Sequence, residues 1–96
     1  MKAEIVYWHK AKLQNRYVLE LKIWNVGKSD NYPDGHKFSL ICFDIKTKKK
    51  ILIDNHKPKR SHIHIDDKEI PYDYVDEDKL IEDFKKIILE HLGVKL

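Results

Sequence analysis

Alternating apolar and polar positions near the amino end of the chain predict two neighbouring strands. In residues 15–26, apolar side chains at 17, 19, 21 and 23 alternate with residues such as Glu20 and Lys22. A period of two is typical of a strand with one buried face. Residues 2–10, with the apolar run Ile5 to Trp8, predict a strand before it.

Turn-forming residues divide the middle of the chain into further short strands. Residues 27–35 are rich in Gly, Ser, Asp, Asn and Pro and predict a loop. Residues 36–45 are apolar on both faces and predict a central strand. A turn at 47–49 then leads into a hairpin strand at 50–54. We expect a short strand at 62–66 and an edge strand at 69–74, since Pro71 cannot donate to a ladder.

A helical period replaces the alternation at the carboxyl end and predicts one helix over residues 77–92. Asp76 is a favourable N-cap, and Gly93 is a typical C-terminal stop. Val75 and Leu80 have the spacing of a hydrophobic staple. One apolar stripe runs along the helix, formed by Leu80, Ile81, Phe84, Ile87, Ile88 and Leu92.

These elements predict a single α+β domain spanning residues 1–96. The expected architecture is an antiparallel sheet of about five to six strands, with one C-terminal helix packed on one face. A helix on one face leaves the other face of the sheet available for a functional site.

Charged residues are distributed unevenly along the chain, and the composition excludes some classes of protein. Residues 1–60 hold 14 Lys and Arg against 6 Asp and Glu, whereas residues 61–96 hold 5 against 10. This asymmetry indicates an anionic partner for one face, or equally a solvated acidic helix. The lone Cys42 excludes an internal disulfide and a multi-cysteine zinc site. We expect a cytoplasmic protein, because no apolar run suggests a signal or a membrane span, and the 36% charged content is typical of a thermophile.

The most distinctive chemical feature is the sequence His62-Ile63-His64 in a predicted strand. Strand geometry places both imidazoles on one face, about 6.5 Å apart along the strand. Paired histidines can give and take protons near neutral pH, as cleavage of RNA at the ribose 2′-hydroxyl requires. Asp54 could orient one of them or cap its strand. Two polar histidines on a solvated face are the plain alternative.

Metal binding is the competing chemical interpretation of the same pair. Histidines two residues apart on a strand can share a cation, with Asp66, Asp54 or His56 as a third ligand. No second tight ligand motif is present, so the sequence favours acid–base chemistry. It predicts a site without metal or any other cofactor.

Basic residues precede the histidine pair and predict binding of a phosphate backbone. Lys57, Lys59 and Arg60 lie directly before it, after the lysine-rich segment 46–50. Solubilising an edge strand is the alternative role for these lysines. Further candidates for RNA contact are Asn55, His56 and Tyr72. Tyr72 could stack on a base or cover the sheet edge.

Several segments together resemble the TumE-type toxin family of prokaryotic toxin–antitoxin pairs. The matching stretches are residues 19–24, 34–40, 53–56 and 62–64, then Glu69, Pro71 with Tyr72, and Leu80 with Asp83 and Phe84. Order and spacing agree over nearly the whole chain. The chain departs from the family pattern at two places. Family members tend to have a glycine in the loop before the histidine pair and another in the turn after it, whereas the corresponding residues 57–61 and 66–68 of this chain contain none.

The resemblance implies a small toxin neutralised by a cognate helix-turn-helix antitoxin, with the family's Asp-Asn and His-x-His core at Asp54, Asn55, His62 and His64. We therefore expect a metal-independent endoribonuclease with RNA as substrate; whether it forms a homodimer stays open. The alternative is a non-catalytic module whose basic face occludes a nucleic acid or protein partner.

Overall fold

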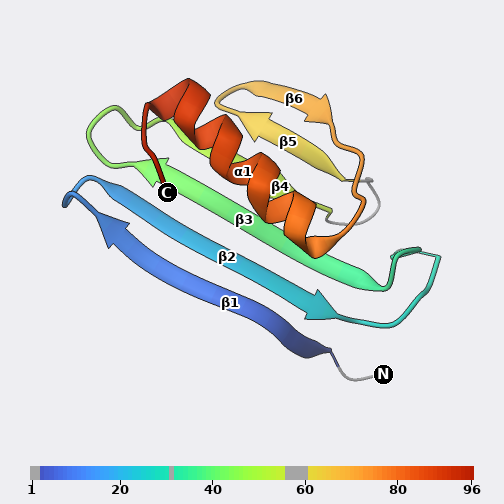
Figure 1. The fold of residues 1–96 in the computed structure, drawn as a ribbon. Coiled ribbons are helices and arrows are strands. Elements are labelled where there is room, and N and C mark those ends of the chain that lie inside the picture. The colour runs from blue at the N-terminus through green and yellow to red at the C-terminus, as the bar shows by residue number, and fades with distance from the viewer. Residues whose placement is uncertain (1–2, 31, 56–60) are drawn as a thin grey trace.

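In the computed structural model, six strands and one helix are formed by the residues that it describes, which are 3–30, 32–55 and 61–96. The strands are β1 (Glu4–Leu13), β2 (Tyr17–Asn25), β3 (His36–Asp44), β4 (Lys50–Asp54), β5 (His62–Ile65) and β6 (Lys68–Pro71). They make one antiparallel sheet in chain order, and the helix α1 (Glu77–Leu92) lies across one side of it (Figure 1). The predicted α+β fold is confirmed.

The helix begins and ends where its capping residues predict. The Asp76 side chain accepts a hydrogen bond of 2.8 Å from the backbone N–H of Lys79. Gly93 has φ +69°, a left-handed conformation that costs glycine little, and its N–H donates to the Leu89 carbonyl. The predicted staple is wrong, because the Val75 side chain is 62% exposed.

The core lies between α1 and the face of the sheet that we call the helix face. Leu80, Phe84 and Ile88 of the helix are fully buried. They belong to one apolar cluster with alternate strand residues, namely Tyr17, Leu19, Leu21, Ile23, Phe38, Leu40, Cys42, Ile51, Ile53 and Ile63. Burial raises the pKa of the Cys42 thiol to about 11, so this cysteine acts as a small core residue.

Strand ends differ from the sequence prediction at the turns. β1 continues to Leu13, and β2 starts at Tyr17, because Gln14 and Asn15 take positive φ values in the turn between them. β6 is shorter than predicted and ends at Pro71, although one further backbone hydrogen bond, from the Tyr72 N–H to the Ser61 carbonyl, follows it. The central position predicted for residues 36–45 is confirmed, since β3 pairs with β2 and β4.

The face of the sheet opposite α1 carries the other set of alternate residues, and we call it the histidine face. The strand register places Trp8, Lys22, Ser39, Asp54 and His62 in one row across five strands. No helix in the described part of the chain is long and apolar enough to cross a membrane.

Candidate functional site on the histidine face

Three polar side chains meet on the histidine face, at the point where β4 ends beside β5. Asp54 is the last residue of β4, and the register pairs it with His62. The Asp54 Oδ1 atom is 3.0 Å from His62 Nε2 and 3.9 Å from His64 Nε2. We call Asp54, His62 and His64 the triad.

The two imidazoles are closer together and less alike than strand geometry alone predicts. Their ring centroids are 4.3 Å apart, and the rings are nearly perpendicular at 81°. The His62 side chain is 8% exposed, whereas that of His64 is 28% exposed. His64 is therefore the histidine that a large substrate reaches from solvent, and His62 lies behind it.

Asp54 has an unusual environment for a half-buried carboxylate. Its Oδ1 atom is shielded from solvent and has no hydrogen bond from the described residues, although His62 Nε2 lies only 3.0 Å away. The contact is close, but it is not aligned as a hydrogen bond. The buried oxygen is thus only partly satisfied by its neighbours, and such groups are found preferentially at functional sites.

Asn55 holds the end of β4 in place. Its Oδ1 atom accepts a hydrogen bond of 2.9 Å from the Phe38 N–H, and its Nδ2 donates one of 2.7 Å to the His36 carbonyl. These bonds to the β3 backbone fix the residue next to Asp54. They support a positioning role, in place of the RNA contact expected for Asn55 from the sequence.

Tyr72 is not brought together with the triad. It follows Pro71, the register partner of His62, and therefore points to the helix face. Its hydroxyl donates a hydrogen bond of 2.7 Å to Asp83 in α1. Burial and the nearby Asp83 raise the pKa of Tyr72 above its usual range. Of the two roles considered for Tyr72, packing over the sheet is the one that this geometry favours.

The other predicted RNA-binding residues are His56, Lys57, Lys59 and Arg60, and they lie outside the described residues. The lysines of the 45–49 turn are at the opposite end of β4 from Asp54. Four residue steps of a strand separate Lys50 from Asp54, or about 13 Å. The 46–50 segment and the triad are therefore separate features of the sheet.

Sequence reasoning missed an aromatic and basic cluster on the histidine face. Trp24 of β2 has the Lys22 ammonium at 5.9 Å and the Lys37 ammonium at 5.6 Å from its ring. Lys22 lies in the same register row as Asp54, two strands away, or about 10 Å. The alternation along β2 contained the signal, since Lys22 and Trp24 share the face that α1 leaves uncovered.

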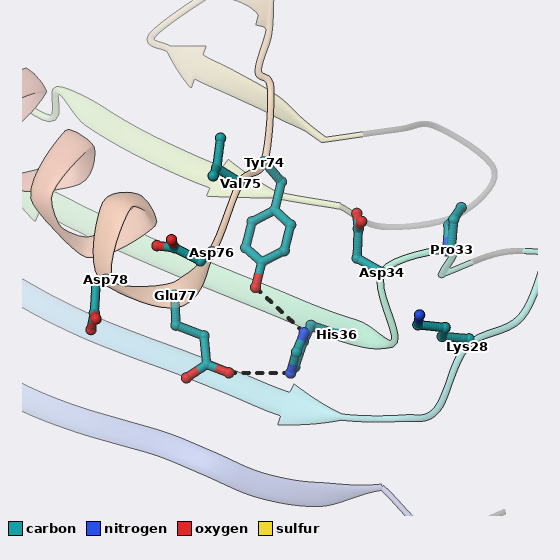
Figure 2. A pocket seen from close by; sticks show the side chains of 9 residues that line it. All are labelled: Lys28, Pro33, Asp34, His36, Tyr74, Val75, Asp76, Glu77 and Asp78. Atoms are coloured by element: carbon teal, nitrogen blue, oxygen red, sulfur yellow. Dashed lines mark hydrogen bonds and ion pairs between the residues drawn. The ribbon is translucent and has the colours of Figure 1, made fainter.

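A separate hollow of about 400 Å³ lies at the amino end of α1, where residues 74–78 face Lys28, residues 33–34 and His36 at the start of β3 (Figure 2). His36 Nε2 pairs with Glu77 at 3.1 Å, and its Nδ1 lies 3.4 Å from the Tyr74 hydroxyl. Burial raises the pKa of Tyr74 to about 12, with a further contribution from Glu77. Because its central histidine is already engaged on both nitrogens, we take this hollow as a structural junction.

Comparisons with protein-family models, with curated proteins and with solved structures found no match to this chain.

Proposed function

We propose that this protein is an RNA-cleaving toxin and that the triad is its reaction centre. The observation that carries the proposal is the convergence of His62 and His64 on Asp54, on a sheet face that also holds Trp24 and Lys22. The toxin role, the cytoplasmic location and the helix-turn-helix antitoxin partner rest on the resemblance to the TumE-type family.

The proposed reaction is transfer of the phosphodiester to the neighbouring ribose oxygen. His64, the accessible imidazole, takes the proton from the 2′-hydroxyl as that oxygen attacks phosphorus. The P–O5′ bond breaks, and His64 donates that proton to the leaving 5′-oxygen. The products are a 2′,3′-cyclic phosphate and a 5′-hydroxyl end, so protons and charge balance without a further reactant.

Asp54 and His62 support His64 in this scheme. The Asp54 carboxylate lies 3.9 Å from His64 Nε2, where it stabilises the imidazolium that forms when His64 takes the proton. His62 is mostly buried beside the same carboxylate and fixes its position. Asn55 anchors the end of the strand that carries Asp54.

The cluster around Trp24 supports RNA as the substrate. Trp24 is partly exposed. Bases stack on accessible aromatic rings whatever their sequence, and lysines beside the ring supply charge for the phosphates. Lys22 and Lys37 both lie against the Trp24 ring. The basic segment 57–60 stays a predicted second contact with the RNA backbone.

The test is cleavage of a defined RNA in EDTA by the wild type, His64→Ala and the control His91→Ala, whose histidine is exposed in the last turn of α1. We expect wild type and control to cleave alike. His64→Ala should be slower by about 100-fold or more, as loss of general acid–base catalysis implies. Full activity of His64→Ala would overturn the assignment. Salt-sensitive RNA binding with no cleavage by the wild type would favour the non-catalytic binding module.

A further inference from the structure

The triad has the composition and spacing of a metal-ligand set. One carboxylate oxygen and two imidazole nitrogens, from Asp54, His62 and His64, all lie within 4.8 Å of one another. A tetrahedral ion with bonds of about 2.0–2.1 Å holds its ligand atoms roughly 3.3–3.4 Å apart. The Asp54 Oδ1 distances of 3.0 and 3.9 Å to the two nitrogens lie on either side of that value.

The shielded Asp54 Oδ1 atom is the second observation that points to a cation. It accepts no hydrogen bond from the described residues, and its 3.0 Å contact with His62 Nε2 is misaligned for one. A bound cation would be coordinated by this carboxylate oxygen together with one nitrogen of each imidazole. A divalent ion bound there would also offset the negative charge of the Asp54 carboxylate.

The chemistry of the ligands selects the class of metal. Imidazole nitrogens suit zinc, cobalt, nickel, copper and iron, whereas magnesium and calcium prefer oxygen ligands. Three protein ligands leave at least one coordination position for water or a substrate oxygen. His64, at 28% exposed, lies at the solvent side through which an ion can enter.

We propose that Asp54, His62 and His64 bind one divalent first-row transition-metal ion. This inference rests on the ligand geometry and does not require the proposed RNA cleavage. The two are nevertheless linked, because an ion held between His64 Nε2 and Asp54 separates the imidazole from the carboxylate that stabilises its protonated form in the proposed reaction. Metal binding therefore inhibits the metal-free reaction.

The test is a titration of metal-stripped protein with Co²⁺, followed by visible absorbance and by calorimetry. We expect one equivalent to bind to the wild type and to His91→Ala, the exposed-histidine control. His64→Ala and Asp54→Asn should each bind at least tenfold more weakly. Circular dichroism confirms that each variant is folded, and Zn²⁺ should raise the Tm of the wild type but not that of His64→Ala. Absence of binding, or binding that both substitutions leave unchanged, would overturn the site.

The same samples separate this inference from the proposed function. Cleavage by the metal-stripped protein in EDTA, together with suppression by one equivalent of Zn²⁺ once the EDTA has been removed, supports both. Cleavage that requires the metal supports the site and overturns the metal-free scheme. Cleavage in EDTA without any Co²⁺ binding overturns the metal site alone. Co²⁺ binding without cleavage under any condition supports the site and overturns the proposed function.

Discussion

Two aspartates end adjacent strands of this sheet and have opposite environments. Asp44 closes β3 on the helix face, where Arg16 donates two hydrogen bonds of 2.9 Å to its two carboxylate oxygens. The Thr47 hydroxyl and the Lys46 N–H donate to it as well. Asp54 closes β4 on the histidine face, and its buried Oδ1 atom accepts no hydrogen bond from the described residues.

The difference separates a carboxylate that serves folding from one that serves chemistry. Hydrogen bonds from Arg16 and Thr47 hold the pKa of Asp44 well below its usual range, so its charge is stabilised in the folded chain. Asp54 has two imidazole nitrogens nearby, both of which can bind a proton or a metal ion. A folded protein retains such an incompletely satisfied group where function requires it.

The largest expected effect is on stability, through Asp44→Asn. This substitution removes the charge that pairs with Arg16, in a side chain that is only 2% exposed. The loss of charge weakens the hydrogen bonds that this buried carboxylate accepts, and we expect Tm to fall by on the order of 10 °C. The matched variant Asp54→Asn should change the free energy of unfolding by less than about 1 kcal/mol. Thermal and urea unfolding measure the stability of both variants. An equal loss of stability in Asp44→Asn and Asp54→Asn would contradict the comparison.

The stabilising effect of the Asp44 charge should depend on pH. The pKa of Asp44 in the folded chain is lowered from its ordinary value of 3.8. Its stabilising contribution is therefore complete above about pH 5 and is lost as the pH falls through 3.8 toward the folded pKa. The stability gap between wild type and Asp44→Asn should narrow below about pH 4. Urea midpoints from pH 7 to pH 2 measure it, and a gap independent of pH would contradict the role assigned to the charge.

A smaller effect is expected on RNA affinity, through Trp24→Ala. Loss of one stacking ring costs about 1–3 kcal/mol, which corresponds to roughly 5- to 150-fold weaker binding. The control is Tyr7→Ala, which removes a part-exposed aromatic residue from β1 on the opposite side of the sheet. Fluorescence anisotropy with a single-stranded RNA measures both. Equal weakening by the two substitutions would exclude the histidine face as the RNA-binding surface.

Local patterns were sufficient to predict most of the fold. The helix bounds 77–92 and the caps Asp76 and Gly93 follow from spacing and capping chemistry alone. The alternation around Ile63 placed His62 and His64 on one face because a strand has a period of two. The end of β1 and the start of β2, on either side of Gln14, were less predictable. The turn between them uses positive φ values in residues other than glycine, which amino-acid composition does not signal.

Contacts between distant segments could not be predicted from the sequence. Arg16 and Asp44 are 28 residues apart, and His36 meets Glu77 across 41 positions. The burial of His62 depends on how β4 and β5 pair. The sequence alone therefore predicts the same exposure for His62 and His64. The rings of His62 and His64 approach to 4.3 Å, and both lie close to Asp54, a combination that the spacing of the two histidines alone does not predict.

The most direct test of the central claim is RNA cleavage by Asp54→Asn in EDTA, measured beside its urea midpoint. The account predicts that the cleavage rate falls about 100-fold or more. The urea midpoint should stay close to that of the wild type, since we expect the free energy of unfolding to change by less than about 1 kcal/mol. Asp44→Asn, assayed at a temperature where it is folded, should retain cleavage. An Asp54→Asn variant that cleaves at the wild-type rate would contradict the assignment of the triad as the reaction centre.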